Sequence, residues 1–177
     1  MLYDNGGIML TFKIMVYSVI FLTSSLIGIL ISKKYSNRVN ELKEFKNALN
    51  IFKTKIRYTY EPIPEIFKEI SFSTNSNISN VFEVAASKMN LFTAGEAWTI
   101  ALKMEDLSIN EDDKIVLNNL SKLLGKTDIQ GQIGQIELTQ DFLDEQIRKA
   151  ELNRTKNEKL YRTLGMVIGL AIVIVLM

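Results

Sequence analysis

Two uncharged apolar segments lie near the ends of the chain, and almost all the charged residues fall between them. The first segment, residues 14–32, holds 19 residues without a charge. As a helix it would reach about 28 Å, close to the ~30 Å hydrocarbon core of a bilayer. No small-residue cleavage site follows it, so we interpret it as an uncleaved membrane anchor and not as a signal peptide. Residues 1–13 form an N-terminal extension, with translation starting at Met1 or Met9.

The second apolar segment, residues 163–177, is shorter and reaches only about 22 Å as a helix. A buried core helix has a similar length. However, every residue after Thr163 is Gly, Ala, Val, Ile, Leu or Met, and a helix without a polar face suits lipid better than the surface of a small domain. We expect a short transmembrane helix whose depth depends on whether Leu160 and Tyr161 also enter the bilayer, with Arg162 extending to the interface.

Basic residues flank both segments on the side of the polar middle. They are Lys33, Lys34, Arg38, Arg154, Lys156, Lys159 and Arg162. Because lysine and arginine are concentrated in cytoplasmic flanks, the polar middle is predicted to lie in the cytoplasm and both chain ends on the far side. The protein is thus expected in the cell membrane, with most of the chain cytoplasmic.

Each apolar segment also contains two small residues four positions apart. These are Ser24 and Gly28 in the first segment, and Gly165 and Gly169 in the second. Small residues at this spacing let another helix approach closely. The contact joins either the two segments of one chain or two copies of a homo-oligomer, and the spacing leaves both open.

The polar middle, residues 33–162, shows helical spacing throughout and no sustained strand-like alternation. One apolar stripe steps by three or four residues and predicts a long helix ending near Tyr60. Its members are Val39, Leu42, Phe45, Leu49, Phe52 and Ile56. Pro62 and Pro64 then break the helix.

Shorter helices are expected to follow, separated by a polar loop at residues 71–77 and by the capping pair Thr93 and Glu96. A further helix has an acidic start at residues 108–113, and a last, long helix begins after Asp128. The same bilayer holds one end of the first and last helices, so these should lie side by side and antiparallel. The predicted fold is all-α: an antiparallel cytoplasmic bundle of about six helices, flanked by the two transmembrane helices.

Composition argues against catalysis. The chain has no histidine and no cysteine, which removes the commonest general base and the thiolate metal ligands. The acidic run at residues 111–113 is best explained as a favourable helix start, and calcium-loop spacing is absent. A net charge of +1 gives no reason to expect nucleic acid as a partner. We therefore predict a protein that is not an enzyme and has no cofactor.

The corner between the last two predicted helices is the strongest candidate for partner binding. Gly125 is placed to end one helix in a left-handed conformation, and Asp128 starts the next. Polar amides lie close by. The candidate partner-binding residues are Leu124, Gly125, Asp128, Gln130 and Gln132.

Several short motifs follow one another along almost the whole chain: RVNEL at 38–42, AL at 48–49, TKIRYTYEPIPEIF at 54–67, EAW at 96–98, LGKTDIQGQ at 124–132 and YRTLGMVIGL at 161–170. In this order they resemble the stage III sporulation protein AB family of endospore-forming bacteria. Lys43 departs from the arginine expected there.

The resemblance implies a component of a channel-like apparatus between mother cell and forespore, on the mother-cell side. It also implies a helical domain similar to that of the inner-membrane platform proteins of type II secretion and type IV pilus machines. The implied partners are the cytoplasmic ATPase and other membrane proteins of the apparatus, with motion transmitted through the paired helices. The alternative function is a membrane-tethered sensor whose bundle binds a regulator or small ligand.

Overall fold

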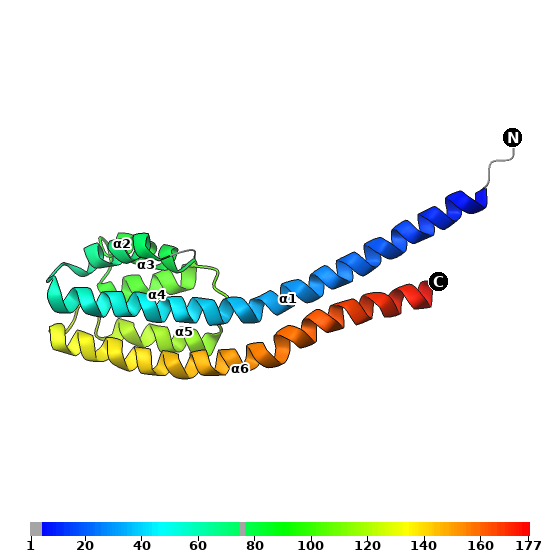
Figure 1. The fold of residues 1–177 in the computed structure, drawn as a ribbon. Coiled ribbons are helices and arrows are strands. Elements are labelled where there is room, and N and C mark those ends of the chain that lie inside the picture. Colours follow the sequence, from blue (N-terminus) through cyan, green and yellow to red (C-terminus); the bar gives the residue numbers. More distant parts are fainter. Residues whose placement is uncertain (1–4, 75–76) are drawn as a thin grey trace. The chain divides into compact units, whose positions relative to one another are not determined.

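The computed structural model describes residues 5–74 and 77–177, and over these residues the regular structure is entirely helical (Figure 1). This confirms the all-α prediction. Residues 1–4 of the predicted N-terminal extension lie outside the described part. The helices are α1 (Asn5–Tyr58), α2 (Ile63–Ser73), α3 (Asn77–Lys88), α4 (Ala94–Met104), α5 (Glu111–Asn118), the 3₁₀ helix η1 (Asn119–Lys122) and α6 (Ile129–Leu176).

The chain forms two compact units, which are described separately. The terminal pair comprises residues 1–36 and 152–177, and the bundle unit comprises residues 37–151. Both α1 and α6 contain a stretch of each unit. These two helices are also long and apolar enough to cross a membrane.

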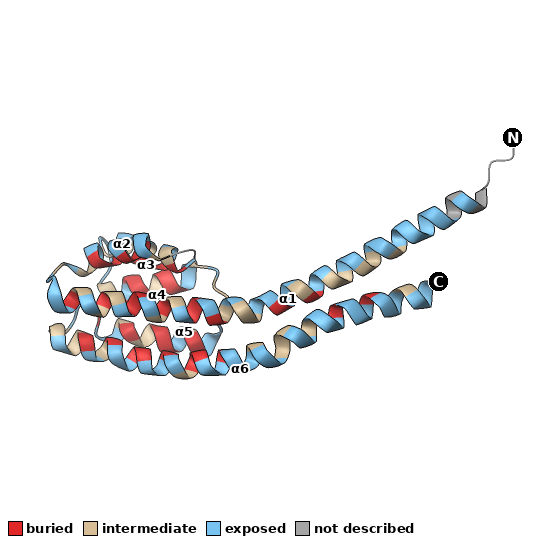
Figure 2. Cartoon of the chain, in the orientation of Figure 1, coloured by how far each residue is buried: buried red, intermediate tan, exposed pale blue. Residues whose placement is uncertain are grey.

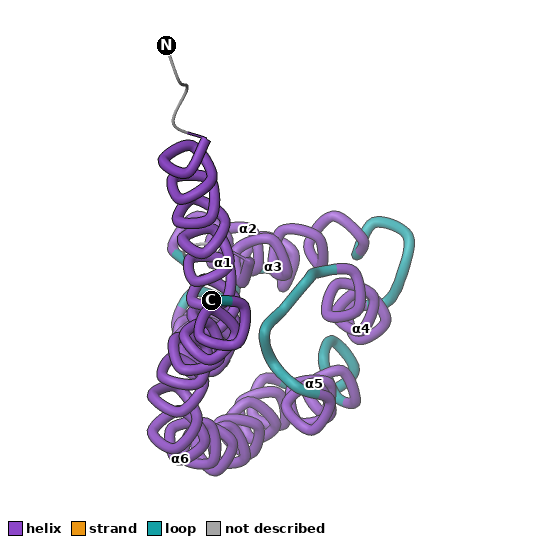
Figure 3. Tube along the Cα trace, turned by 90° about the vertical axis from the view of Figure 1, so that its right-hand side faces the viewer, coloured by secondary structure: helices purple, strands orange, loops and turns teal. Residues whose placement is uncertain are grey.

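In the bundle unit, α1 and α6 contribute apolar stripes to a shared core, and α2, α3, α4 and α5 follow one another around it (Figure 3). Buried positions face inward on every helix (Figure 2). Trp98 lies at the centre of an aromatic cluster, with its ring centroid 5.3 Å from that of Phe82 and 5.7 Å from that of Phe67. Its indole N–H donates to the carbonyl of Leu117 at 2.9 Å, so the polar group of this buried ring is satisfied.

A row of ion pairs lies beside the core contact between α1 and α6. On α6 the acids Glu137, Asp144 and Glu151 recur every seven residues, which keeps them on one edge of the helix. Lysines of α1 meet them with Nζ–O distances of 3.5 Å (Lys53–Glu137), 2.5 Å (Lys46–Asp144) and 2.6 Å (Lys43–Glu151). The pairing order is that of antiparallel helices, so charge and apolar spacing favour the same register.

The helix starts follow local sequence. Pro62 precedes α2, and the predicted capping box of Thr93 and Glu96 is confirmed at α4. A second capping box, Asn110 with Asp113, starts α5.

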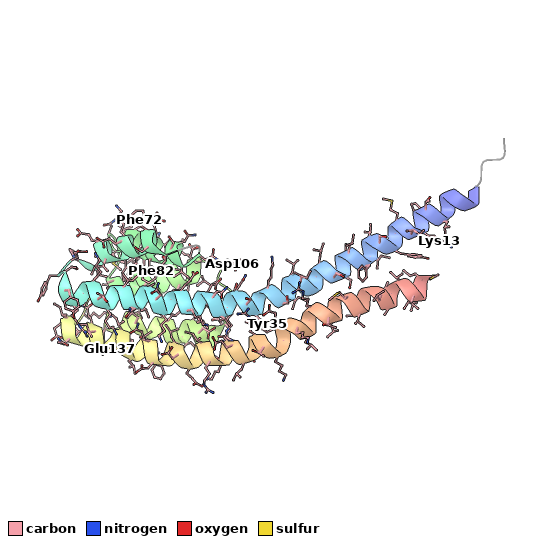
Figure 4. The ribbon with its side chains drawn as sticks, in the orientation of Figure 1. Lys13, Tyr35, Phe72, Phe82, Asp106 and Glu137 are labelled. Carbon is pink, nitrogen blue, oxygen red and sulfur yellow. The ribbon has the colours of Figure 1, made fainter. Side chains whose placement is uncertain are left out.

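Two predicted boundaries were wrong. The polar loop expected at residues 71–77 begins later, because α2 continues to Ser73. The hydroxyls of Ser71 and Ser73 donate to carbonyls one turn back, which satisfies both serines inside the helix. Phe72 consequently lies exposed on α2, whereas Phe82 lies in the core (Figure 4). The helix expected to reach Leu124 ends at Asn118 and continues as the tighter η1.

In the terminal pair, α1 and α6 pack through small residues. The Ser24 hydroxyl donates to the carbonyl of Gly165 at 2.7 Å. A Cβ added at Gly28 would lie 2.7 Å from the carbonyl oxygen of Tyr161, and one added at Gly169 would lie 3.1 Å from the Cβ of Ser24. The four small residues named from the sequence therefore belong to one contact within the chain. Most other apolar side chains of this pair are exposed (Figure 2).

Candidate functional site

Three loops lie together at one end of the bundle unit. They join α1 to α2 (residues 59–62), α3 to α4 (residues 89–93) and η1 to α6 (residues 123–128). Gly125 lies against the first residues of α4 and α2, which follow the other two loops. A Cβ added at Gly125 would lie 3.2 Å from the Cβ of Ala94 and 3.7 Å from the Cδ1 of Ile63. Figure 1 shows the same end, where α2 and α6 begin. We call it the bundle-end surface.

The bundle-end surface exposes large apolar and aromatic side chains. Leu91 is 81% exposed, Tyr60 78% and Tyr58 70%, while Phe92 and Leu123 are also exposed. Phe92 lines a shallow groove between α4 and the η1–α6 corner, whose other walls include Ile100, Lys122 and Lys126. Exposed apolar side chains gathered in one region, with charged groups beside them, are typical of protein-binding surfaces.

Tyr60 has an unusual backbone. Its φ of 56° lies in the left-handed region, which glycine adopts readily but a bulky residue such as tyrosine rarely does. Residues held in such conformations cluster at binding and catalytic sites. The conformation occurs just before Glu61 and Pro62, where the chain leaves α1. A conformation of this kind therefore marks the first of the three loops as a functional candidate.

The corner predicted from the sequence belongs to this surface, and its residues have different roles. Gly125 has a φ of 72°, as its expected helix-ending role requires. The Asp128 carboxylate accepts the Gly131 N–H at 2.9 Å, and the Gln132 amide donates to the Thr127 carbonyl at 3.2 Å. Asp128 and Gln132 thus build the corner.

Two of the five candidate partner-binding residues differ sharply in exposure. Gln130 is exposed, whereas Leu124 is 2% exposed and lies in the core. The prediction is corrected at Leu124, because the turn at Gly125 directs that side chain inward and a partner has no access to it.

Sequence patterns alone did not indicate the first two loops of this surface. One signal in the sequence could have indicated them, because large apolar residues stand where loops are expected. Leu91 and Phe92 directly precede the α4 cap, and Tyr60 precedes Glu61 and Pro62. Their gathering at one end depends on the fold.

Of the basic residues that flank the apolar segments, two are engaged in ion pairs. Arg38 binds Asp113 of α5 through Nε at 2.7 Å and a second nitrogen at 2.9 Å, and Arg154 pairs with Glu158 at 2.7 Å. Arg38 therefore also fastens α5 of the bundle unit to α1. The remaining five are exposed and form no ion pair within the described residues: Lys33, Lys34, Lys156, Lys159 and Arg162.

The buried carboxylate of Glu41 holds the structure together and, within the described part of the chain, is not part of a metal site. Glu41 is 7% exposed and accepts the backbone N–H of Ser108 at 2.6 Å. Burial raises the pKa of this carboxyl despite that hydrogen bond. Within residues 5–74 and 77–177, no three or more metal-ligating side chains come together. Glu41 thus fixes the loop before α5 to α1.

Comparison with known proteins gives consistent matches. The family model described as "Stage III sporulation protein AB" matches residues 13–177. Stage III sporulation protein AB of Bacillus subtilis (strain 168) is 26% identical over 154 residues, covering 85% of this chain and 90% of that protein. A solved structure of a stage III sporulation protein AB superposes with a TM-score of 0.64 at 22% identity, over 68% of this chain and 98% of that one. That structure shows the same fold.

Proposed function

The chain belongs to the stage III sporulation protein AB family, and we propose that it is a membrane platform component of a secretion-like sporulation apparatus. In this proposal it binds the cytoplasmic ATPase of the apparatus through the bundle-end surface and works by contact, not catalysis. The bundle unit is cytoplasmic in this proposal, as the basic flanks favour, and lies on the mother-cell side, as the family resemblance implies. Other membrane proteins of the apparatus contact the terminal pair.

The bundle-end surface carries this proposal. Tyr58, Tyr60 and Leu91 are each more than two-thirds exposed there and share one end of the unit, whereas Phe72 of α2 is the one other large apolar side chain of the bundle unit exposed to that extent within the described residues. Large aromatic side chains contribute much of the binding free energy when a partner buries them, so the group at this end is the strongest candidate contact. The left-handed backbone of Tyr60 sets the direction in which this side chain leaves the loop.

The pairing of α1 and α6 supports transmission of force. In the bundle unit the two helices share an apolar core and a row of three lysine–carboxylate pairs. Both helices also contain an apolar segment long enough to cross a membrane. A partner that displaces the bundle end would therefore pull on two helices whose mutual register is fixed.

The ligand-binding alternative has less support. A sensor needs a pocket with room for a ligand and convergent polar groups. The centre of this bundle is instead filled by Trp98, Phe45, Phe67 and Phe82, all fully buried, with adjacent centroids between 5.0 and 6.4 Å apart. A filled aromatic core favours the platform function.

Site-specific photocrosslinking in sporulating cells tests the proposal. A photoreactive phenylalanine analogue is placed at Tyr60 or Leu91, with Phe72 and Phe142 as matched controls because both are exposed in the same unit. We expect the ATPase to crosslink from the bundle-end positions alone. Crosslinks from the control positions only, or from none of the four, would reject this contact.

A further inference from the structure

The charge of this protein is unevenly distributed along the chain. Residues 33–36 and 152–162 contain six cations and one carboxylate, a net charge of +5. Residues 37–151 contain 14 cations and 18 carboxylates, a net charge of −4. The overall net charge of +1 therefore hides a strongly basic segment next to the apolar runs.

Both α1 and α6 contribute cations to this basic segment, at the same position along the axes of the two helices. Tyr35 of α1 stacks on Tyr161 of α6 with ring centroids 5.7 Å apart and an interplanar angle of 15°. A hydrogen bond with Tyr161 also raises the pKa of the Tyr35 hydroxyl. The stack fixes the axial alignment of the two helices, and tyrosine is enriched at the headgroup level of membranes.

Five exposed cations lie within five residues of Tyr35 or Tyr161 along the chain, and we call them the basic collar: Lys33, Lys34, Lys156, Lys159 and Arg162. At ~1.5 Å per residue along either helix, each lies within about 8 Å of the stack, the thickness of a headgroup layer. The nearest acid, Glu158, is already paired with Arg154. The collar thus presents unneutralised positive charge from two helices at the membrane surface.

We propose that the basic collar binds the phosphate groups of anionic phospholipids and selects them over zwitterionic lipids. Lysine and arginine beside an anionic leaflet are attracted to it, and the attraction falls off within a Debye length, about 8 Å at physiological salt. An anionic membrane surface attracts the positively charged collar and repels the bundle unit, whose net charge is negative. The collar is therefore the part of the protein expected to touch the lipid headgroups. This inference does not depend on the proposed ATPase partner.

Spin-label electron paramagnetic resonance on the full-length protein in phosphatidylcholine vesicles tests the proposal. The measurement is the association constant of spin-labelled phosphatidylglycerol relative to spin-labelled phosphatidylcholine. We expect the wild type to prefer phosphatidylglycerol several-fold, and K33Q/K34Q/K159Q to bring the ratio close to one, since three of the five attracting cations are lost. The preference should also weaken at high salt.

Two variants separate collar binding from general charge or folding effects. K33R/K34R/K159R retains the charge and should retain the preference. K68Q/K88Q/K103Q removes two exposed lysines and one half-buried lysine of the bundle unit, none ion-paired within the described part of the chain, and should leave the preference unchanged. Far-UV circular dichroism checks that every variant stays helical.

Three outcomes would overturn the proposal. One is no preference in the wild type, and another is an unchanged preference in K33Q/K34Q/K159Q. The third is loss of the preference in excess glycerol 3-phosphate, which presents the same phosphate without acyl chains and would identify the collar as a site for soluble phosphates.

Discussion

Arg38 of α1 and Asp113 of α5 form a two-point ion pair across 75 positions of the chain, with N–O distances of 2.7 and 2.9 Å. The Asp113 side chain is fully buried and Arg38 is 13% exposed. Asp113 also exchanges hydrogen bonds with Asn110 in the capping box of α5. One carboxylate thus starts α5 and fastens it to α1.

Asp113→Ala should destabilise the bundle by about 3 kcal/mol, because it leaves a largely buried guanidinium without its partner. The single tryptophan, buried Trp98, reports unfolding by its fluorescence in detergent-solubilised protein. Glu111→Ala in the exposed pair with Lys114 is the matched control, and should cost under about 1 kcal/mol. Equal costs for the two variants would show that the Arg38 contact contributes little.

Reversing charges along the α1–α6 row should weaken the register of the two helices. K46E/K53E replaces two exposed attractive pairs by repulsive ones and should lower the free energy of unfolding by about 1–2 kcal/mol, less at high salt. Adding R57E/E137K/D144K restores opposite charges at both pairs and at Arg57, which also lies 3.6 Å from Glu137. Recovery of the melting temperature in the quintuple variant is the expected result, and failure to recover would mean that these pairs do not set the register.

A disulfide can test the packing of the terminal pair, since the chain has no native cysteine. The Cβ of Ser24 and a Cβ built at Gly169 are 3.1 Å apart, so S24C/G169C needs only a small separation to reach disulfide geometry. We expect an oxidised monomer with altered mobility on a non-reducing gel. T23C/G169C, with an exposed residue instead of Ser24, should not close. A dimer band from S24C/G169C would assign the small residues to contact between copies.

Glu41 makes stability depend on pH in a definite direction. Burial raises its folded-state pKa above the ordinary value of 4.5, so protonation favours the folded state. Its contribution is fully present below about pH 4.5 and is lost as the pH rises through the folded pKa. Glu41→Gln keeps an oxygen for the Ser108 N–H and removes the charge.

Glu41→Gln should therefore melt higher than the wild type at neutral pH, with the difference shrinking toward pH 4.5. Other carboxyls act oppositely: hydrogen bonds lower the pKa of Glu96 and of Glu145, so their contributions are lost as the pH falls. The comparison must consequently be the difference between variant and wild type at each pH. A constant difference across the range would contradict the assignment to Glu41.

Helix starts and turns were predictable where one short stretch holds all the interacting groups. Thr93 and Glu96 cap α4 within one turn, and Gly125 adopts the left-handed conformation that its position indicated. Ser71 and Ser73 misled the loop prediction, because serine hydroxyls bond equally well to a turn or to a helix carbonyl.

The sequence by itself determined the two apolar segments, the all-helical class and the inward face of each helix, because these follow from the spacing of apolar and charged residues. Only the tertiary structure decided that Arg38 belongs to Asp113, that Leu124 is buried, and that Tyr60 and Leu91 share an end with Gly125. Those relationships join residues tens of positions apart. Periodicity sets which face of a helix turns inward, but the packing of whole helices sets which residues then meet.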